Sequence, residues 1–152
     1  MKIYKFTAII VLMLVGMLTT SCEDEKDLLV IEGDIPFKTS TLYIVGDATP
    51  AVWDVNNMFP LERSEEDHLV FIYDGNLQQG ELKAYITQGS WDGAPCIRPM
   101  TAGSPISKAN NVEQFQINTG GVDLKWVVKE SGHYRLEFNF RDFTLTTTYL
   151  GV

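Results

Sequence analysis

The C-terminal part of the chain alternates regularly between apolar and polar residues. From His133 to Phe140 every second residue is apolar, and a similar alternation returns from Phe143 to Tyr149. A period of two is typical of β-strands that bury one face. Arg141 and Asp142, between the two segments, can form a turn. The sequence therefore predicts a β-hairpin here.

The rest of the chain after residue 40 shows the same preference for strands. Val, Ile, Thr, Tyr and Phe dominate its short apolar segments, and none has a helical period. Asp74–Asn76 is predicted to end one strand, and Gly89–Pro105 to form a long irregular loop. We expect about seven strands in a single antiparallel, immunoglobulin-like β-sandwich, an all-β fold. The further predicted strands are Leu42–Val45, Leu69–Tyr73, Glu81–Thr87, Gln114–Ile117 and Leu124–Val128.

Residues 1–21 have the composition of a secretory signal peptide. Lys2 and Lys5 precede the apolar segment Ala8–Leu18, which is shorter than the roughly 20 residues of a membrane span. Leu18–Cys22 resembles a lipobox, in which the Cys is acylated and becomes the first mature residue. The alternative is an ordinary cleavage site with an incidental Cys. We expect a lipid on Cys22, which would leave Cys96 without a disulfide partner.

Residues 22–40 have the composition of a tether between this anchor and a domain at 41–152. The acidic run Glu23–Asp27 is explained by a solvated spacer alone. It also resembles the surface-export signal of lipoproteins in the Bacteroides group. We therefore expect a protein anchored by lipid to the outer membrane and exposed at the cell surface.

The acidic balance of the chain limits its partners. Its formal net charge is −8, and loss of Lys2 and Lys5 would make this −8 − 2 = −10. Such a protein gains little from contact with phosphates, so we expect no nucleic-acid partner. Anionic lipid headgroups would repel it as well. Contact with a membrane is thus expected through acyl chains only.

The sequence contains few residues suited to catalysis. Its two histidines, His68 and His133, each begin a predicted strand, and no common catalytic, phosphate-binding or C-x-x-C motif is present. Glu65–Asp67 are adjacent on a turn, so they point apart. Asp92 or Asp123 could contribute to a calcium site, but no loop pattern supports one. We expect no enzymatic activity, no cofactor and no metal.

Aromatic residues on predicted loops point to ligand binding instead. Trp53 follows the first strand, and Trp91 lies between glycines after the strand that carries Lys83 and Tyr85. A Trp offers a flat apolar surface for the C–H face of a sugar ring, while Lys can donate hydrogen bonds to hydroxyl groups. Alternatively, Trp53 packs in the core and Lys83 is merely solvated. Trp126, within a strand, is predicted to be a core residue.

Four segments of the chain carry a family resemblance. They are LYIVGDATPAVW at Leu42–Trp53, GELK at Gly80–Lys83, Trp91, and DLKW at Asp123–Trp126. Together they resemble the starch-binding modules of SusE/SusF-type outer-membrane lipoproteins, over nearly the whole domain from Thr41 to Leu150. The order Trp, Lys, Trp is also similar to that of glycogen-binding modules in branching enzymes and in the AMP-activated kinase β subunit.

The resemblance implies a β-sandwich of the carbohydrate-binding-module type that captures starch or a related α-glucan for uptake. It departs from the family in having one module rather than several, and Ala84 where an aromatic residue is common. The alternative is an interaction module that kept the fold without the ligand and contacts other uptake lipoproteins; a small glycan hydrolase ranks below both. The implied site residues are Trp53 and Trp91 for stacking, Lys83 for hydrogen bonding, and Tyr85, Arg98 and Lys125 for further polar contacts.

Overall fold

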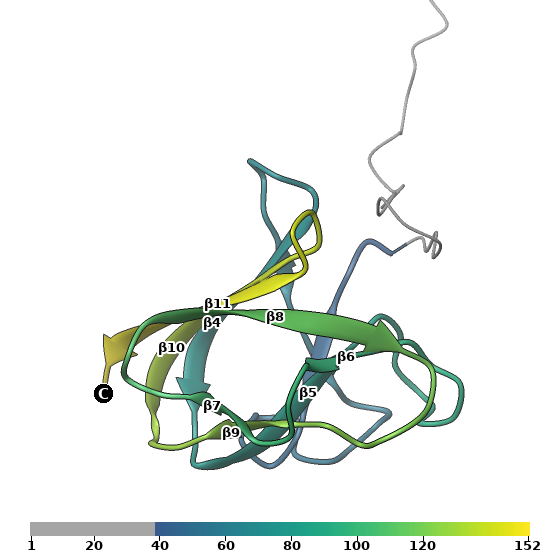
Figure 1. The fold of residues 1–152 in the computed structure, drawn as a ribbon, viewed down its shortest axis with the longest axis horizontal. Helices are drawn as coiled ribbons and strands as arrows, with labels where there is room; N and C mark the ends of the chain where they lie inside the picture. Colours follow the sequence, from purple (N-terminus) through teal and green to yellow (C-terminus); the bar gives the residue numbers. More distant parts are fainter. Residues whose placement is uncertain (1–38) are drawn as a thin grey trace, which may run out of the picture.

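The structure, a computed structural model, describes residues 39–152 (Figure 1). The predicted signal peptide, the lipidation of Cys22 and most of the tether lie outside the described residues. Within residues 39–152 no helix could cross a membrane. The described strands are β1 (Tyr43–Val45), β2 (Phe59–Pro60), β3 (Glu62–Arg63), β4 (Val70–Leu77), β5 (Gly80–Tyr85), β6 (Cys96–Pro99), β7 (Ser104–Ile106), β8 (Asn111–Asn118), β9 (Trp126–Val128), β10 (Gly132–Asn139) and β11 (Thr144–Gly151).

The strands form two layers that share β8. One layer has the order β2-β1-β5-β6-β8, and the other continues β8-β11-β10-β4-β3, with every neighbouring pair antiparallel. The first half of β8 pairs with β11, and its second half pairs with β6. A strand that passes from one sheet to the other forms a corner of a sandwich. The predicted all-β antiparallel sandwich is confirmed.

A second corner almost closes the sheet into a barrel. β2 pairs with β1 at one end of the strand order, and β3 pairs with β4 at the other end. Only Leu61 separates β2 from β3 in the sequence. Its side chain is buried, and its backbone N–H donates to the carbonyl oxygen of Leu42 at 2.7 Å. Five consecutive residues therefore join the two ends of the sheet.

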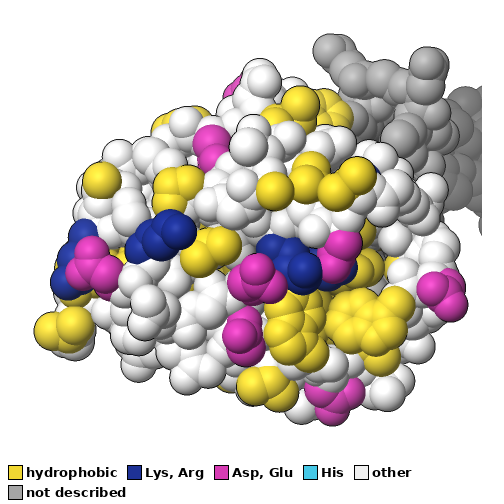
Figure 2. Space-filling view, turned by 60° about the horizontal axis from the view of Figure 1, so that its bottom comes forward, with side chains coloured by type: hydrophobic (Ala, Val, Ile, Leu, Met, Phe, Trp, Pro, Cys, Tyr) yellow, Lys and Arg dark blue, Asp and Glu magenta, His cyan; other side chains and the backbone are white. Residues whose placement is uncertain are grey.

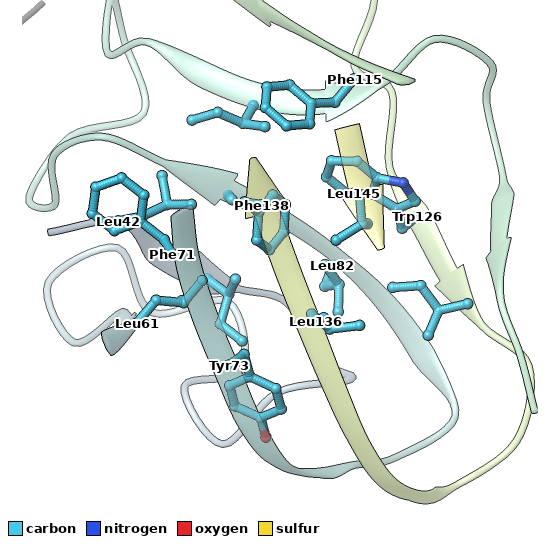
Figure 3. Packing of buried hydrophobic residues seen from close by; sticks show 14 of the residues in the cluster. Leu42, Leu61, Phe71, Tyr73, Leu82, Phe115, Trp126, Leu136, Phe138 and Leu145 are labelled. Atoms are coloured by element: carbon cyan, nitrogen blue, oxygen red, sulfur yellow. The ribbon is translucent and has the colours of Figure 1, made fainter. Parts of the chain in front are cut away.

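The core lies between the two layers and is rich in aromatic rings (Figure 3). Trp126 is fully buried, as predicted, and its ring lies 5.7 Å from that of Phe138. Its indole N–H donates to the carboxylate of Glu113, so the one polar atom of the indole is satisfied. The predicted hairpin is also confirmed: β10 pairs with β11, and each buries the face that the alternation predicts.

Two predictions about turns and loops were wrong. Asp74–Asn76 does not end a strand, because β4 continues to Leu77 and Gly75 pairs with Tyr134 of β10. Gly89–Pro105 is not wholly irregular, since it contains β6 and the start of β7. β7 has β9 as its neighbour, in a parallel pair. Pro105 is tolerated there because an edge strand can accommodate a residue without an N–H.

Candidate functional site

The Gly-Asp-Ala-Thr-Pro loop fixes the path of the chain that leads to Trp53. Gly46 has φ 140°, and a Cβ atom on it would lie 2.1 Å from the carbonyl oxygen of Glu81. Only glycine permits so close an approach. The Asp47 carboxylate accepts a hydrogen bond of 2.6 Å from the backbone N–H of Glu81, and the Thr49 hydroxyl donates to the carbonyl of Gly46 at 2.9 Å. The loop is thereby tied to the start of β5.

A fork in the sheet brings the other site residues beside this loop. One edge of β5 pairs with β1, where Val45 lies opposite Lys83. On its other edge β5 pairs first with β9, through Gly80–Leu82, and then with β6, through its last two residues. Lys83 therefore sits where β6 and β9 diverge. Residues 119–125, which connect β8 to β9, pass this point and deliver Asp123 and Lys125.

These segments enclose an open cleft of about 510 Å³. Five of the six glycan-binding residues predicted from the sequence line it. Figure 2 turns the lower side of Figure 1 forward, where β5 and β9 lie, and shows basic side chains flanked by acidic ones beside a broad hydrophobic patch. The lining residues are Trp53, Glu81, Lys83, Tyr85, Trp91, Asp123 and Lys125.

The two loop tryptophans meet at this cleft and are exposed. Trp53 is 38% exposed and Trp91 is 41% exposed, and their ring centroids lie 6.4 Å apart with the planes inclined at 55°. Tyr85 is buried, and its ring packs against Trp91 at 5.7 Å. Tyr85 therefore supports Trp91. The predicted position of Trp53 outside the core is the one observed.

A carboxylate binds both lysines of the cleft. The Lys83 ammonium lies 2.6 Å from Asp123, and the Lys125 ammonium lies 2.8 Å from Asp123 and 3.7 Å from Glu81. The Lys83 ammonium also lies over the rings of Tyr85 and Trp91, and that of Lys125 lies over Trp53. Such cation–π contacts fix the position of each ammonium relative to the rings.

These contacts stabilise the charged forms of Asp123 and Lys83. Hydrogen bonds from Lys125 and Lys83 hold the pKa of Asp123 below its ordinary value. Burial alone would lower the pKa of Lys83, but its hydrogen bonds to Asp123 and Tyr85 outweigh this, and the pKa is raised. At neutral pH, Asp123 is therefore a carboxylate and Lys83 an ammonium.

Arg98, also predicted as a site residue, lies outside the cleft. It is buried, and it donates hydrogen bonds to the carbonyl oxygens of Gly120, at 2.8 Å, and Val122. It lines a smaller adjoining hollow of about 130 Å³, which shares Lys83, Tyr85, Trp91 and Asp123 with the cleft. Cys96, a free and buried cysteine, also lines this hollow. Arg98 thus holds the loop that carries Asp123.

The sequence did not identify two acidic residues of the cleft, Glu81 and Asp123, as binding residues. Glu81 shares the outward face of β5 with Lys83, and Asp123 lies two residues before Lys125. These two sequence positions are therefore weak signals that Glu81 and Asp123 lie beside the predicted binding lysines. The sequence indicates Asp123 only as a potential calcium ligand, and the described residues contain no group of three potential metal ligands.

A scan of protein-family models and searches of curated proteins and of solved structures found no match.

Proposed function

We propose that this chain is a non-catalytic glycan-binding protein that captures starch or a related α-glucan. The convergence of exposed Trp53 and Trp91 at one cleft carries the proposal. Indole rings offer flat apolar surfaces for the C–H faces of sugars, and Lys83, Lys125 and Asp123 supply polar groups beside them for the hydroxyls. As in the SusE/SusF-type modules, the protein would be anchored at the cell surface through Cys22 and pass glycan to an uptake system.

The inclination of the two tryptophans supports a curved ligand. A straight, flat chain that stacked on Trp53 would meet Trp91 at 55° and could not stack on both rings. An α-glucan bends from one unit to the next, so successive sugars can follow inclined planes. The cleft is shallow and open, and we expect weak binding with Kd of about 0.1–1 mM, which is about −4 to −5.5 kcal/mol.

Two observations weigh against the other functions. An interaction module without a ligand would favour tryptophans that are buried or far apart, and these are exposed and adjacent. A glycosidase needs a carboxylic acid with a raised pKa, whereas the pKa of Asp123 is lowered by its lysine partners. Capture without hydrolysis is therefore the function that the cleft supports best.

Affinity electrophoresis of the purified protein in gels with starch or glycogen tests the proposal. We expect the polysaccharide to retard the protein, and Trp53→Ala combined with Trp91→Ala to abolish the retardation. Phe59→Ala is a matched control, because Phe59 is an aromatic residue with the same exposure as Trp53 that does not line the cleft. Retardation that persists in the double variant would refute the site. Release of sugars from the polysaccharide would refute the non-catalytic function.

A further inference from the structure

The charges of the cleft cancel, but they are not equally accessible. Two lysines and two carboxylates line it, so their formal charges sum to zero. The side chains of Lys83 and Lys125 are only 11% and 24% exposed, whereas those of Asp123 and Glu81 are 58% and 49% exposed. The carboxylates are therefore the more accessible of the charged groups in the cleft. An incoming ligand meets aromatic faces and acceptor oxygens before it meets a positive charge.

We propose that Asp123 restricts this cleft to uncharged, hydroxyl-rich ligands and excludes anionic ones. This rests on the proposed function, because it specifies which glycans the cleft accepts. An ionised carboxylate only accepts hydrogen bonds, so it suits the hydroxyl donors of a neutral sugar. A carboxyl or sulfate group on the ligand would instead face Asp123 and Glu81 at short range. The ammonium groups of the two lysines cannot offset this repulsion, because both already form ion pairs with Asp123.

The central position of Asp123 makes it the residue that determines whether an anionic ligand can bind in the cleft. Among the described residues, Asp123 is the carboxylate that contacts both ammonium groups, at 2.6 and 2.8 Å. Glu81 contacts Lys125 alone, at 3.7 Å. Replacing Asp123 by the isosteric Asn would keep the size of the side chain and free both ammonium groups for a ligand anion. The cleft would then carry one net positive charge.

Two probes with the same backbone, starch and carboxymethyl starch, test the proposal. Binding of both is measured on the same preparation of wild-type protein and of Asp123→Asn, at low and high salt. We expect wild-type protein to bind carboxymethyl starch at least tenfold more weakly than starch. Asp123→Asn should raise the affinity for carboxymethyl starch relative to that for starch at least tenfold, and high salt should reduce this gain. Partial unfolding of a preparation lowers both apparent affinities by the same factor, so the ratio of the two affinities does not depend on it.

Glu65→Gln is the matched control, because it removes one negative charge from an exposed turn outside the cleft. The proposal would be overturned if Glu65→Gln gave the same gain in relative affinity for carboxymethyl starch as Asp123→Asn. It would also be overturned if Asp123→Asn left this relative affinity unchanged, or if wild-type protein bound both probes equally. If Asp123→Asn binds neither probe, Glu81→Gln decides: a smaller gain supports the proposal and an unchanged ratio overturns it. Failure of wild-type protein to bind any starch would instead refute the proposed function.

Discussion

Gly46 shows how one residue positions the candidate site. Its backbone passes so close to β5 that the Cβ of an alanine would overlap the Glu81 carbonyl. The Gly-Asp-Ala-Thr-Pro segment, which carried part of the family resemblance, therefore acts through the backbone. Gly46, Asp47 and Thr49 bind the loop to itself and to β5, and only the Trp53 side chain beyond it reaches the cleft.

We predict that Gly46→Ala destabilises the fold by about 3 kcal/mol or more, because it combines an unfavourable φ with a backbone overlap. Urea denaturation followed by circular dichroism measures this loss. Gly89→Ala is the control: Gly89 also has a positive φ, 97°, but a Cβ there meets no atom within 4 Å. It should cost only about 1 kcal/mol. Equal losses in the two variants would contradict the role of the close approach.

Asp67 gives the fold a dependence on acid. The backbone N–H of Leu69, 2.9 Å from its carboxylate, is the largest cause that lowers its pKa below the ordinary 3.8, with help from Arg141. A lowered pKa contributes stability above pH 3.8 that is lost as the pH falls through the lower, folded value. We predict that Asp67→Asn flattens the loss of stability between pH 4 and pH 2, measured as the urea midpoint at each pH. Glu65→Gln, on the same turn, should leave the slope closer to that of wild-type protein.

At the scale of elements, the sequence predicted the strands that alternate and failed where pairing overrode local composition. β10 and β11 were found because each has one buried face. Asp74–Asn76 has the composition of a turn, yet β10 lies beside it and continues the ladder. β6 and β7 were missed because Pro99 and Pro105 fall within them. Local sequence does not contain the partner strands that allow these exceptions.

Leu77 tests the extension of β4. It ends the strand beyond the misassigned turn and is 2% exposed within the core cluster. We predict that Leu77→Ala lowers the free energy of unfolding by about 2–5 kcal/mol, because it leaves a cavity. Val122→Ala, on an exposed loop position, should change it by less than about 0.5 kcal/mol. A small effect of Leu77→Ala would show that the strand ends earlier.

The site was predictable from the sequence only where the type and position of a single residue indicate ligand binding. Trp53 and Trp91 are large aromatic residues on loops, and Lys83 lies on the outward face of its strand. The cluster around Asp123 was not predictable, because it depends on β5 pairing with β9 and β6 in succession. Arg98 was predicted to contact the ligand because its guanidinium partners could not be seen in the local sequence: they are the carbonyl oxygens of residues 120 and 122, more than 20 positions away.

At the scale of the whole molecule, the near closure of the sheet confines the strands with a single neighbour to very short segments. Each described strand longer than four residues has a neighbour on each edge along at least part of its length. The strands with a single neighbour, β2, β3 and β7, are two or three residues long. Short edges offer little template for the pairing of another chain.

The position of the C-terminal hairpin also sets the time at which the protein can fold. β10 and β11 lie between β4 and β8, although they come last in the sequence among the described strands. A nascent chain without them lacks Tyr134, Leu136, Phe138 and Leu145 of the core cluster, and among these is the ring against which Trp126 packs. Long-range pairing of this kind is slow to form. Folding can therefore be completed only after β11 has been synthesised, and until then β4 and β8 each lack a neighbouring strand.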